Sequence, residues 1–128
     1  MTEQGGSGEL MSCRWLRPAE GPGSSWTTSV ISEWELRRAT YTDRHPHEEV
    51  NVVLEGVLHV TGAGVTRTAR AGEVVVVEPG VTGTYWTDSY ARMLAVYGPN
   101  PTGAASTYPP GATPLDADGV PGGQAPPD

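Results

Sequence analysis

Short runs of β-branched and aromatic residues, separated by turn residues, recur through residues 26–98. One of these runs, Val74–Val77, is uninterrupted and is closed by the turn residues Pro79 and Gly80. Runs at this spacing are typical of all-β sandwiches and barrels, and no segment has convincing helical periodicity. We therefore predict an all-β domain of about eight strands in an antiparallel double sheet or barrel, because closure limits exposed edges.

Glycine-containing turns set the predicted strand boundaries. The stretch "EVNVVLEGVLHVTGAGVTRTARAG" is predicted to hold three strands, with breaks at Glu55 and Gly56 and over residues 62–64. Further strands are predicted in "TSVISEWEL", "EVVVVEPG", "GTYWT" and "ARMLAVYG".

The two ends of the chain differ from this central region in composition. Residues 99–128 contain eight Pro and five Gly with few apolar residues, so we predict a disordered tail there. Residues 1–25 are predicted to be a partly disordered arm and linker, although residues 10–17 have enough apolar content to add a strand. The predicted folded domain is thus residues 26–98.

Charge and composition exclude several functions. The chain has 15 acidic and 8 basic residues, a net charge of -7 that argues against a nucleic-acid partner. All the basic residues are Arg, so Lys-dependent Schiff-base chemistry and a P-loop are excluded. Cys13 is the single cysteine, and no apolar stretch approaches the length of a membrane span. With no signal-peptide pattern, these features predict a cytoplasmic protein without a membrane partner.

The stretch "DRHPHEEVNVVLEG" gathers acidic residues and histidines beside an apolar run. On one straight strand, His45 and Glu49 would lie about 13 Å apart, too far to share an ion. Pro46 favours a corner between them, which lets the two side chains converge. Alternation along the following strand then places Asn51 and Val53 on the same face as Glu49.

The same stretch resembles the first motif of the cupin superfamily. Aligned on Glu49 and Gly56, the motif's second histidine falls on His45 and its first on Asp43. The second motif resembles "GEVVVVEPGVTGTYWT", with Gly83 where the family has its metal-binding histidine. The resemblance covers residues 26–98 and implies a jelly-roll barrel, or double-stranded β-helix.

The resemblance also implies a metal site with one ligand missing. Asp43, His45 and Glu49 would hold a divalent ion such as Zn, Mn, Ni or Fe, weakly and with open positions. Within the cupins, "EEVNVVLEGVLHV", "ARAGEVVVVEPG" and "ARMLAVYGP" are similar to ethanolamine-utilisation cupins, a branch with a degraded metal site. A histidine introduced at Gly83 is expected to restore the fourth ligand. The alternative for His45 and Glu49 is a solvated hydrogen-bonded pair at a strand corner.

Three further residues bear on the site. Tyr85 is in phase with Gly83 and is expected to face a cavity that the glycine enlarges, or else to be an ordinary core residue with a satisfied hydroxyl. His47 is expected on the rim, and His59 on the outer face of the barrel.

Two functions from different classes follow. The first is a small enzyme with His45, Glu49 and Tyr85 as catalytic residues, acting on a small polar substrate by acid/base or weakly metal-assisted chemistry of the lyase, isomerase or cyclase kind. The second is a non-catalytic cupin that binds a small molecule or serves as an accessory subunit. The short core and the apolar N-terminal segment further predict a homodimer.

Overall fold

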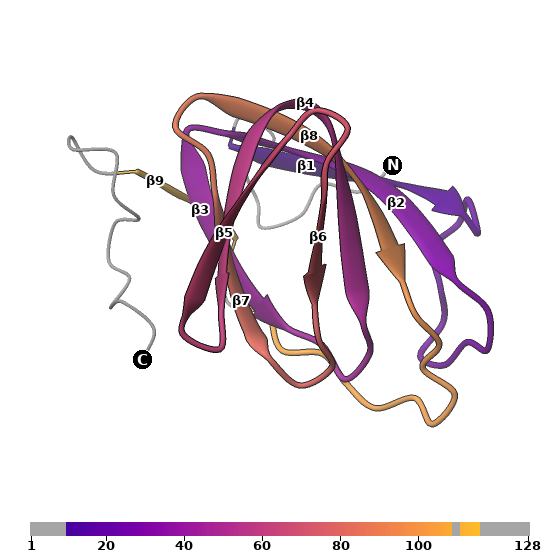
Figure 1. Ribbon diagram of the computed structural model, residues 1–128. Helices are drawn as coiled ribbons and strands as arrows, with labels where there is room; N and C mark the ends of the chain where they lie inside the picture. The colour runs from indigo at the N-terminus through magenta and orange to yellow at the C-terminus, as the bar shows by residue number, and fades with distance from the viewer. Residues whose placement is uncertain (1–9, 109–110, 116–128) are drawn as a thin grey trace.

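The computed structural model describes residues 10–108 and 111–115, and these form strands joined by turns and loops with no helix (Figure 1). The strands are β1 (Met11–Arg17), β2 (Val30–Arg37), β3 (Ala39–Arg44), β4 (Glu49–Gly62), β5 (Val65–Arg70), β6 (Val74–Val77), β7 (Thr82–Trp86), β8 (Tyr90–Tyr97) and β9 (Thr113–Pro114). The all-β prediction is confirmed. The described part of the chain holds no helix long and apolar enough to cross a membrane.

Two antiparallel layers share the long strand β4. The order along the main path is β1-β2-β8-β4-β7-β3-β9, and both β5 and β6 pair with β4. The first half of β4 pairs with β6 and β8, whereas its second half pairs with β5 and β7. The sheet therefore curls on itself and encloses the core. The large side chains buried within it include Met11, Leu36, Val53, Leu58, Tyr85 and Met93.

The predicted break at Glu55 and Gly56 is a bulge within one strand. The register of β4 against β8 shifts between Val53 and Glu55, and the chain continues without a turn. Gly56 has a φ of 81°, and a Cβ there would lie 1.9 Å from the carbonyl oxygen of Tyr90. The predicted strand break is therefore wrong, because Gly56 bends β4 from one layer into the other without ending the strand. The predicted turn over residues 62–64 is present between β4 and β5.

Both ends of the chain add to the barrel. Strand β1 pairs with β2, with Cys13 opposite Trp34, as the apolar content of residues 10–17 predicted. The structure differs from the predicted disorder over residues 99–108 and 111–115. There Thr107 bridges Arg44, and β9 pairs with β3. Composition misses this because the contacts are largely between backbone groups. Residues 1–9, 109–110 and 116–128 lie outside the described residues.

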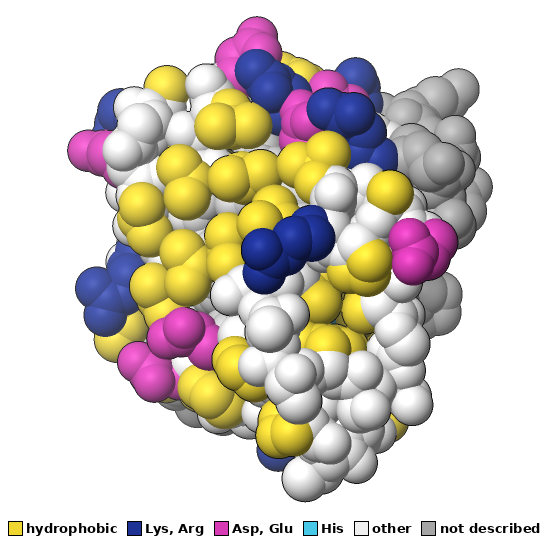
Figure 2. All heavy atoms as spheres, turned by 90° about the vertical axis from the view of Figure 1, so that its right-hand side faces the viewer, with side chains coloured by type: hydrophobic (Ala, Val, Ile, Leu, Met, Phe, Trp, Pro, Cys, Tyr) yellow, Lys and Arg dark blue, Asp and Glu magenta, His cyan; other side chains and the backbone are white. Residues whose placement is uncertain are grey.

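One outer surface of the barrel is apolar. Figure 2 shows hydrophobic side chains gathered on this side of the molecule. The outward-facing residues of β2, β8, β4 and β6 that form this outer apolar face are Ile31, Leu94, Val96, Val50, Val52, Leu54, Val74 and Val76. The inward-facing residues of the same strands pack in the core, so the sheet follows the period of two that strands impose.

Candidate functional site

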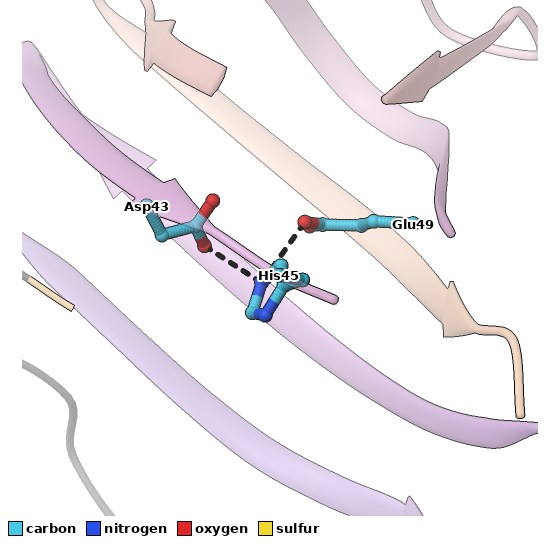
Figure 3. A group of neighbouring side chains, drawn as sticks. All are labelled: Asp43, His45 and Glu49. Carbon is cyan, nitrogen blue, oxygen red and sulfur yellow. Dashed lines mark hydrogen bonds and ion pairs between the residues drawn. The ribbon is translucent and has the colours of Figure 1, made fainter. Parts of the chain in front are cut away.

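Asp43, His45 and Glu49 meet inside the barrel, where the chain turns from β3 into β4 (Figure 3). Asp43 lies on β3 opposite Gly83 of β7, His45 follows the end of β3, and Glu49 is the first residue of β4. A bend at Pro46 joins the two strands, as the sequence predicted. This corner brings together three side chains that a straight strand would separate.

The imidazole of His45 lies between the two carboxylates. Its Nε2 is 3.0 Å from Asp43 Oδ2 and 3.2 Å from Glu49 Oε1. Its Nδ1 is 2.8 Å from Ser106 Oγ, a residue of the C-terminal segment. All three side chains are buried, with 5%, 3% and 2% exposure for Asp43, His45 and Glu49. The alternative of a solvated pair at the corner is therefore wrong.

Further hydrogen bonds fix the Glu49 carboxylate. Tyr85 donates its hydroxyl proton to Oε1 at 2.8 Å, and Asn51 donates its amide to Oε2 at 3.1 Å. Asn51 Oδ1 in turn accepts a hydrogen bond from the indole N–H of Trp34 at 2.8 Å. Sequence reasoning placed Asn51 on the correct face, but it did not predict the hydrogen bond from Trp34. A buried asparagine on an inward strand face was the available signal for this network.

The electrostatics of the group depend on burial and on mutual attraction. Burial, followed by the charge of Glu49, raises the pKa of Asp43 to about 6. Burial alone would lower the pKa of His45, but hydrogen bonds to Asp43 and Glu49 and their charges outweigh it and raise the pKa to about 10. Burial would likewise raise the pKa of Glu49, but the hydrogen bond and charge of His45 lower it. Without a metal, His45 is therefore an imidazolium at neutral pH.

Burial raises the pKa of Tyr85 well above its ordinary value, and the neighbouring carboxylates Glu49 and Asp43 add to the rise. The hydroxyl therefore keeps its proton at neutral pH. A carboxylate oxygen can only accept a hydrogen bond, so Tyr85 is the donor to Glu49.

The residues fit a divalent ion. One ligand atom from each of Asp43, His45 and Glu49 lies within 4.8 Å of the others. Within the described part of the chain, the buried Asp43 Oδ1 has no hydrogen-bond partner. The Tyr85 hydroxyl also lowers the pKa of Asp43, but its single proton is donated to Glu49. A divalent ion in place of the His45 Nε2 proton would balance both carboxylates, whereas one imidazolium leaves a negative charge.

The space left by Gly83 is filled by Tyr85. A Cβ built on Gly83 would lie 2.9 Å from the Tyr85 hydroxyl oxygen and 3.0 Å from its Cζ. The Tyr85 side chain is fully buried, so it cannot swing away into solvent. The expected enlarged cavity at Gly83 is thus occupied. A histidine introduced there alone would collide with the ring instead of completing the site.

The other two histidines lie apart from the carboxylates. His47 is only 3% exposed, so the expectation of an open rim position is wrong. Its ring stacks on His45 at 4.6 Å between centroids, and it also contacts Trp26 and Tyr97. Burial lowers the pKa of His47. His59 lies half-buried on the outside of the barrel, 2.8 Å from Thr68 Oγ1, as predicted.

Two cavities adjoin the group. The inner one has a volume of about 20 Å³ and is bordered by both Asp43 and Glu49. That volume holds a single water or ion. A larger cleft of about 390 Å³ lies beyond His47. Tyr97 and Tyr108 border both spaces.

This geometry occurs in a chain whose residues 35–97 match the family model described as "Cupin domain". The chain belongs to the cupin superfamily. None of the curated protein sequences matches it significantly.

Solved cupin structures share the fold. Ethanolamine utilization protein Q from Salmonella typhimurium LT2 is 24% identical with a TM-score of 0.60, over 70% of this cupin and 70% of that chain. An RmlC-like cupin from Shewanella frigidimarina is 21% identical with a TM-score of 0.58, over 72% and 78%. The DMSP lyase DddQ from Ruegeria pomeroyi is 20% identical with a TM-score of 0.64, over 77% of this cupin and 51% of that chain. The resemblance seen in the sequence is thereby confirmed at the level of the fold.

Proposed function

We propose that this cupin is a small enzyme that acts on a small polar substrate by acid/base chemistry assisted by a divalent ion. Asp43, His45 and Glu49 would bind the ion, and the Tyr85 hydroxyl would supply the proton for the acid/base step. The observation that carries this proposal is the convergence of three buried ionisable groups, with one Asp43 oxygen left unpartnered. Burying such groups is costly, and simple packing would favour apolar residues in their place.

The residues suit that role. A bound divalent ion would polarise a substrate oxygen or lower the pKa of a bound water. Glu49 is held by hydrogen bonds on both of its oxygens, so its orientation is set before any ligand arrives. Tyr85 keeps its proton in a hydrogen bond to Glu49 Oε1 and, in this proposal, would donate it to a substrate atom that replaces that oxygen as acceptor.

A second candidate function is a non-catalytic binding cupin. It is favoured by the small inner cavity of about 20 Å³, which has no room for an organic substrate beside the three side chains. The space large enough for a small molecule is the outer cleft of about 390 Å³.

Calorimetric titration tests the metal part of the proposal. Zinc, manganese, nickel and ferrous ions are titrated into chelator-treated protein that carries no histidine tag. Wild type should bind one ion per chain, and His45→Ala should bind none because it removes the nitrogen ligand. His59→Ala is the matched control, since this histidine lies outside the barrel. Equal loss in both variants, or no uptake by wild type, would overturn the metal site.

Deuterium exchange separates the enzyme from the binding cupin. Metal-loaded protein in deuterated water is incubated with a mixture of small hydroxy acids, keto acids and aldehydes, and proton NMR follows their carbon-bound protons. The enzyme should convert a compound or exchange one of its protons, and Tyr85→Phe should slow this by about a hundredfold, as expected for a lost acid/base group. No change in any compound favours the binding cupin.

A further inference from the structure

The outer cleft is lined by a row of aromatic rings. Trp15 and Tyr97 are 6.2 Å apart between centroids, Tyr97 and His47 are 5.0 Å apart, and His47 and Trp26 are 5.1 Å apart. Tyr108 also borders this cleft of about 390 Å³. The rings come from β1, from β8 and from three loops, so tertiary folding assembles the row.

Local contacts hold the two indoles in place. Trp26 donates its N–H to the carbonyl oxygen of Gly98 at 2.8 Å. Beside Trp15, a Cβ on Gly21 would lie 3.0 Å from the indole nitrogen, so the backbone packs closely against this ring. Aromatic side chains held in this way lose little further freedom when a ligand binds.

The described residues that line the cleft include no Arg or Lys. Among the residues that line it in the described part of the chain, Glu20 is the acidic one and none is Arg, while Lys is absent from the whole sequence. Asp43, Glu49 and the imidazolium of His45 lie nearby, on the other side of Tyr97 and Tyr108, and the two carboxylates outweigh the one imidazolium. With a chain charge of -7, this surface repels anions and attracts cations.

From these observations we propose that the outer cleft binds an organic cation that carries a methylated ammonium or similar onium group. Aromatic rings attract such a group through their electron-rich faces, and the methyl groups find an apolar surface. The volume lies within the usual range for small-molecule sites. This inference goes beyond the proposed function, because it concerns the cleft alone and does not require a metal at Asp43, His45 and Glu49.

A matched pair of probes tests the proposal on the wild-type protein. Choline and 3,3-dimethyl-1-butanol have nearly the same shape, but only choline carries a positive charge. Calorimetry should show choline binding at least tenfold tighter than the neutral alcohol, as a cation–π contribution implies. Equal affinities would indicate an ordinary apolar pocket, and no choline binding would show that the cleft is no cation site; either result overturns the proposal.

The location is tested by the indole signals in NMR spectra. Choline should shift the N–H signals of Trp15 and Trp26 and leave that of Trp86 unchanged. Trp26→Leu should weaken choline binding about tenfold, whereas the matched control Trp86→Leu should not. Shifts at Trp86 but at neither cleft indole would overturn the assignment without any variant having to fold.

The cleft and the proposed metal group can fail independently. His45→Ala should lose metal binding yet keep measurable choline binding, because His45 packs behind the rings of His47, Tyr97 and Tyr108 and does not itself line the cleft. Trp26→Leu should weaken choline binding about tenfold yet keep its metal uptake, which also reports that the variant is folded. If His45→Ala abolished choline binding and Trp26→Leu did not, the cation would sit at the carboxylates and the cleft assignment would be wrong.

Discussion

At the scale of single residues, His45 makes both the stability of the fold and the metal affinity of the site depend on pH. Its pKa is raised from 6.5 to about 10 because Asp43 and Glu49 stabilise the imidazolium against the cost of burial. A raised pKa stabilises the folded protein fully below pH 6.5, and this contribution is lost as the pH rises through about 10. Metal affinity should change in the opposite sense and increase with pH, since the ion competes with the proton.

We therefore predict that chelator-treated protein becomes less stable between about pH 6.5 and pH 10. Thermal melting across that range should show a falling Tm, and His45→Gln should largely remove the slope. Asp43 titrates lower, with a pKa of about 6, and does not dominate this window. A Tm that rises with pH in wild type, or the same slope in His45→Gln, would contradict the assigned ion pair.

Gly83 and Tyr85 form a second residue-scale test, because they compete for one space. Gly83→His alone should lower the Tm by several degrees without tightening metal binding, since the new side chain meets the Tyr85 ring. Gly83→His combined with Tyr85→Ala should bind the ion roughly tenfold more tightly than Tyr85→Ala alone, which is the control. Melting curves and calorimetry on the three variants decide it. Tighter metal binding by Gly83→His alone would show that the Tyr85 ring moves aside for the new histidine.

At the scale of elements, the corner between β3 and β4 and the C-terminal segment both position His45. Ser106 lies 2.8 Å from His45 Nδ1, and Thr107 pairs with Arg44 through both backbone groups. We predict that deleting residues 101–128 lowers the Tm by several degrees and weakens metal binding, because these contacts are lost. Deleting only residues 116–128 is the control, as every described contact stays. Equal Tm values for wild type and both deletions would show that the segment adds nothing to stability.

The sequence predicted those elements that rest on local patterns. Alternation placed Glu49 and Asn51 on one face, and Pro46 predicted the corner that brings His45 to Glu49. Pairing between segments far apart in the chain could not be predicted from the sequence. Gly56 signals a turn and a bulge alike, and only the approach of Tyr90 decides between them. The pairing of Thr107 with Arg44 uses backbone groups, which carry no composition signal.

At the scale of the whole molecule, the strand register makes the outer apolar face a continuous surface. Ile31, Val96, Val50 and Val76 are cross-strand neighbours in one row, and Leu94, Val52 and Val74 form a second row. Val74 and Val76, which lie on β6 at the ends of the two rows, are 54% and 40% exposed, so the apolar surface is open to solvent there. At the border, the charges of Arg92 and Glu33 are paired with each other at 2.8 Å, so this pair adds no net charge beside the face.

We propose that a second copy of this chain covers the outer apolar face in a two-fold dimer. Light scattering at micromolar concentration should give the mass of a dimer for wild type and of a monomer for Val74→Glu. Val65→Glu is the matched control, since Val65 is 47% exposed but lies on β5, outside the face. A monomeric wild type, or dimers in all three proteins, would contradict this interface.

Crystals soaked in manganese will show whether Asp43, His45 and Glu49 together hold a divalent ion. An anomalous difference map should show one peak within bonding distance of three atoms: Nε2 of His45 and one carboxylate oxygen each from Asp43 and Glu49. Asp43 Oδ1 should then have a partner. The crystals should be soaked at neutral pH or above, because a higher pH favours the ion over the proton on His45. A map with no peak there, or with manganese peaks only at surface carboxylates, would rule out the metal site.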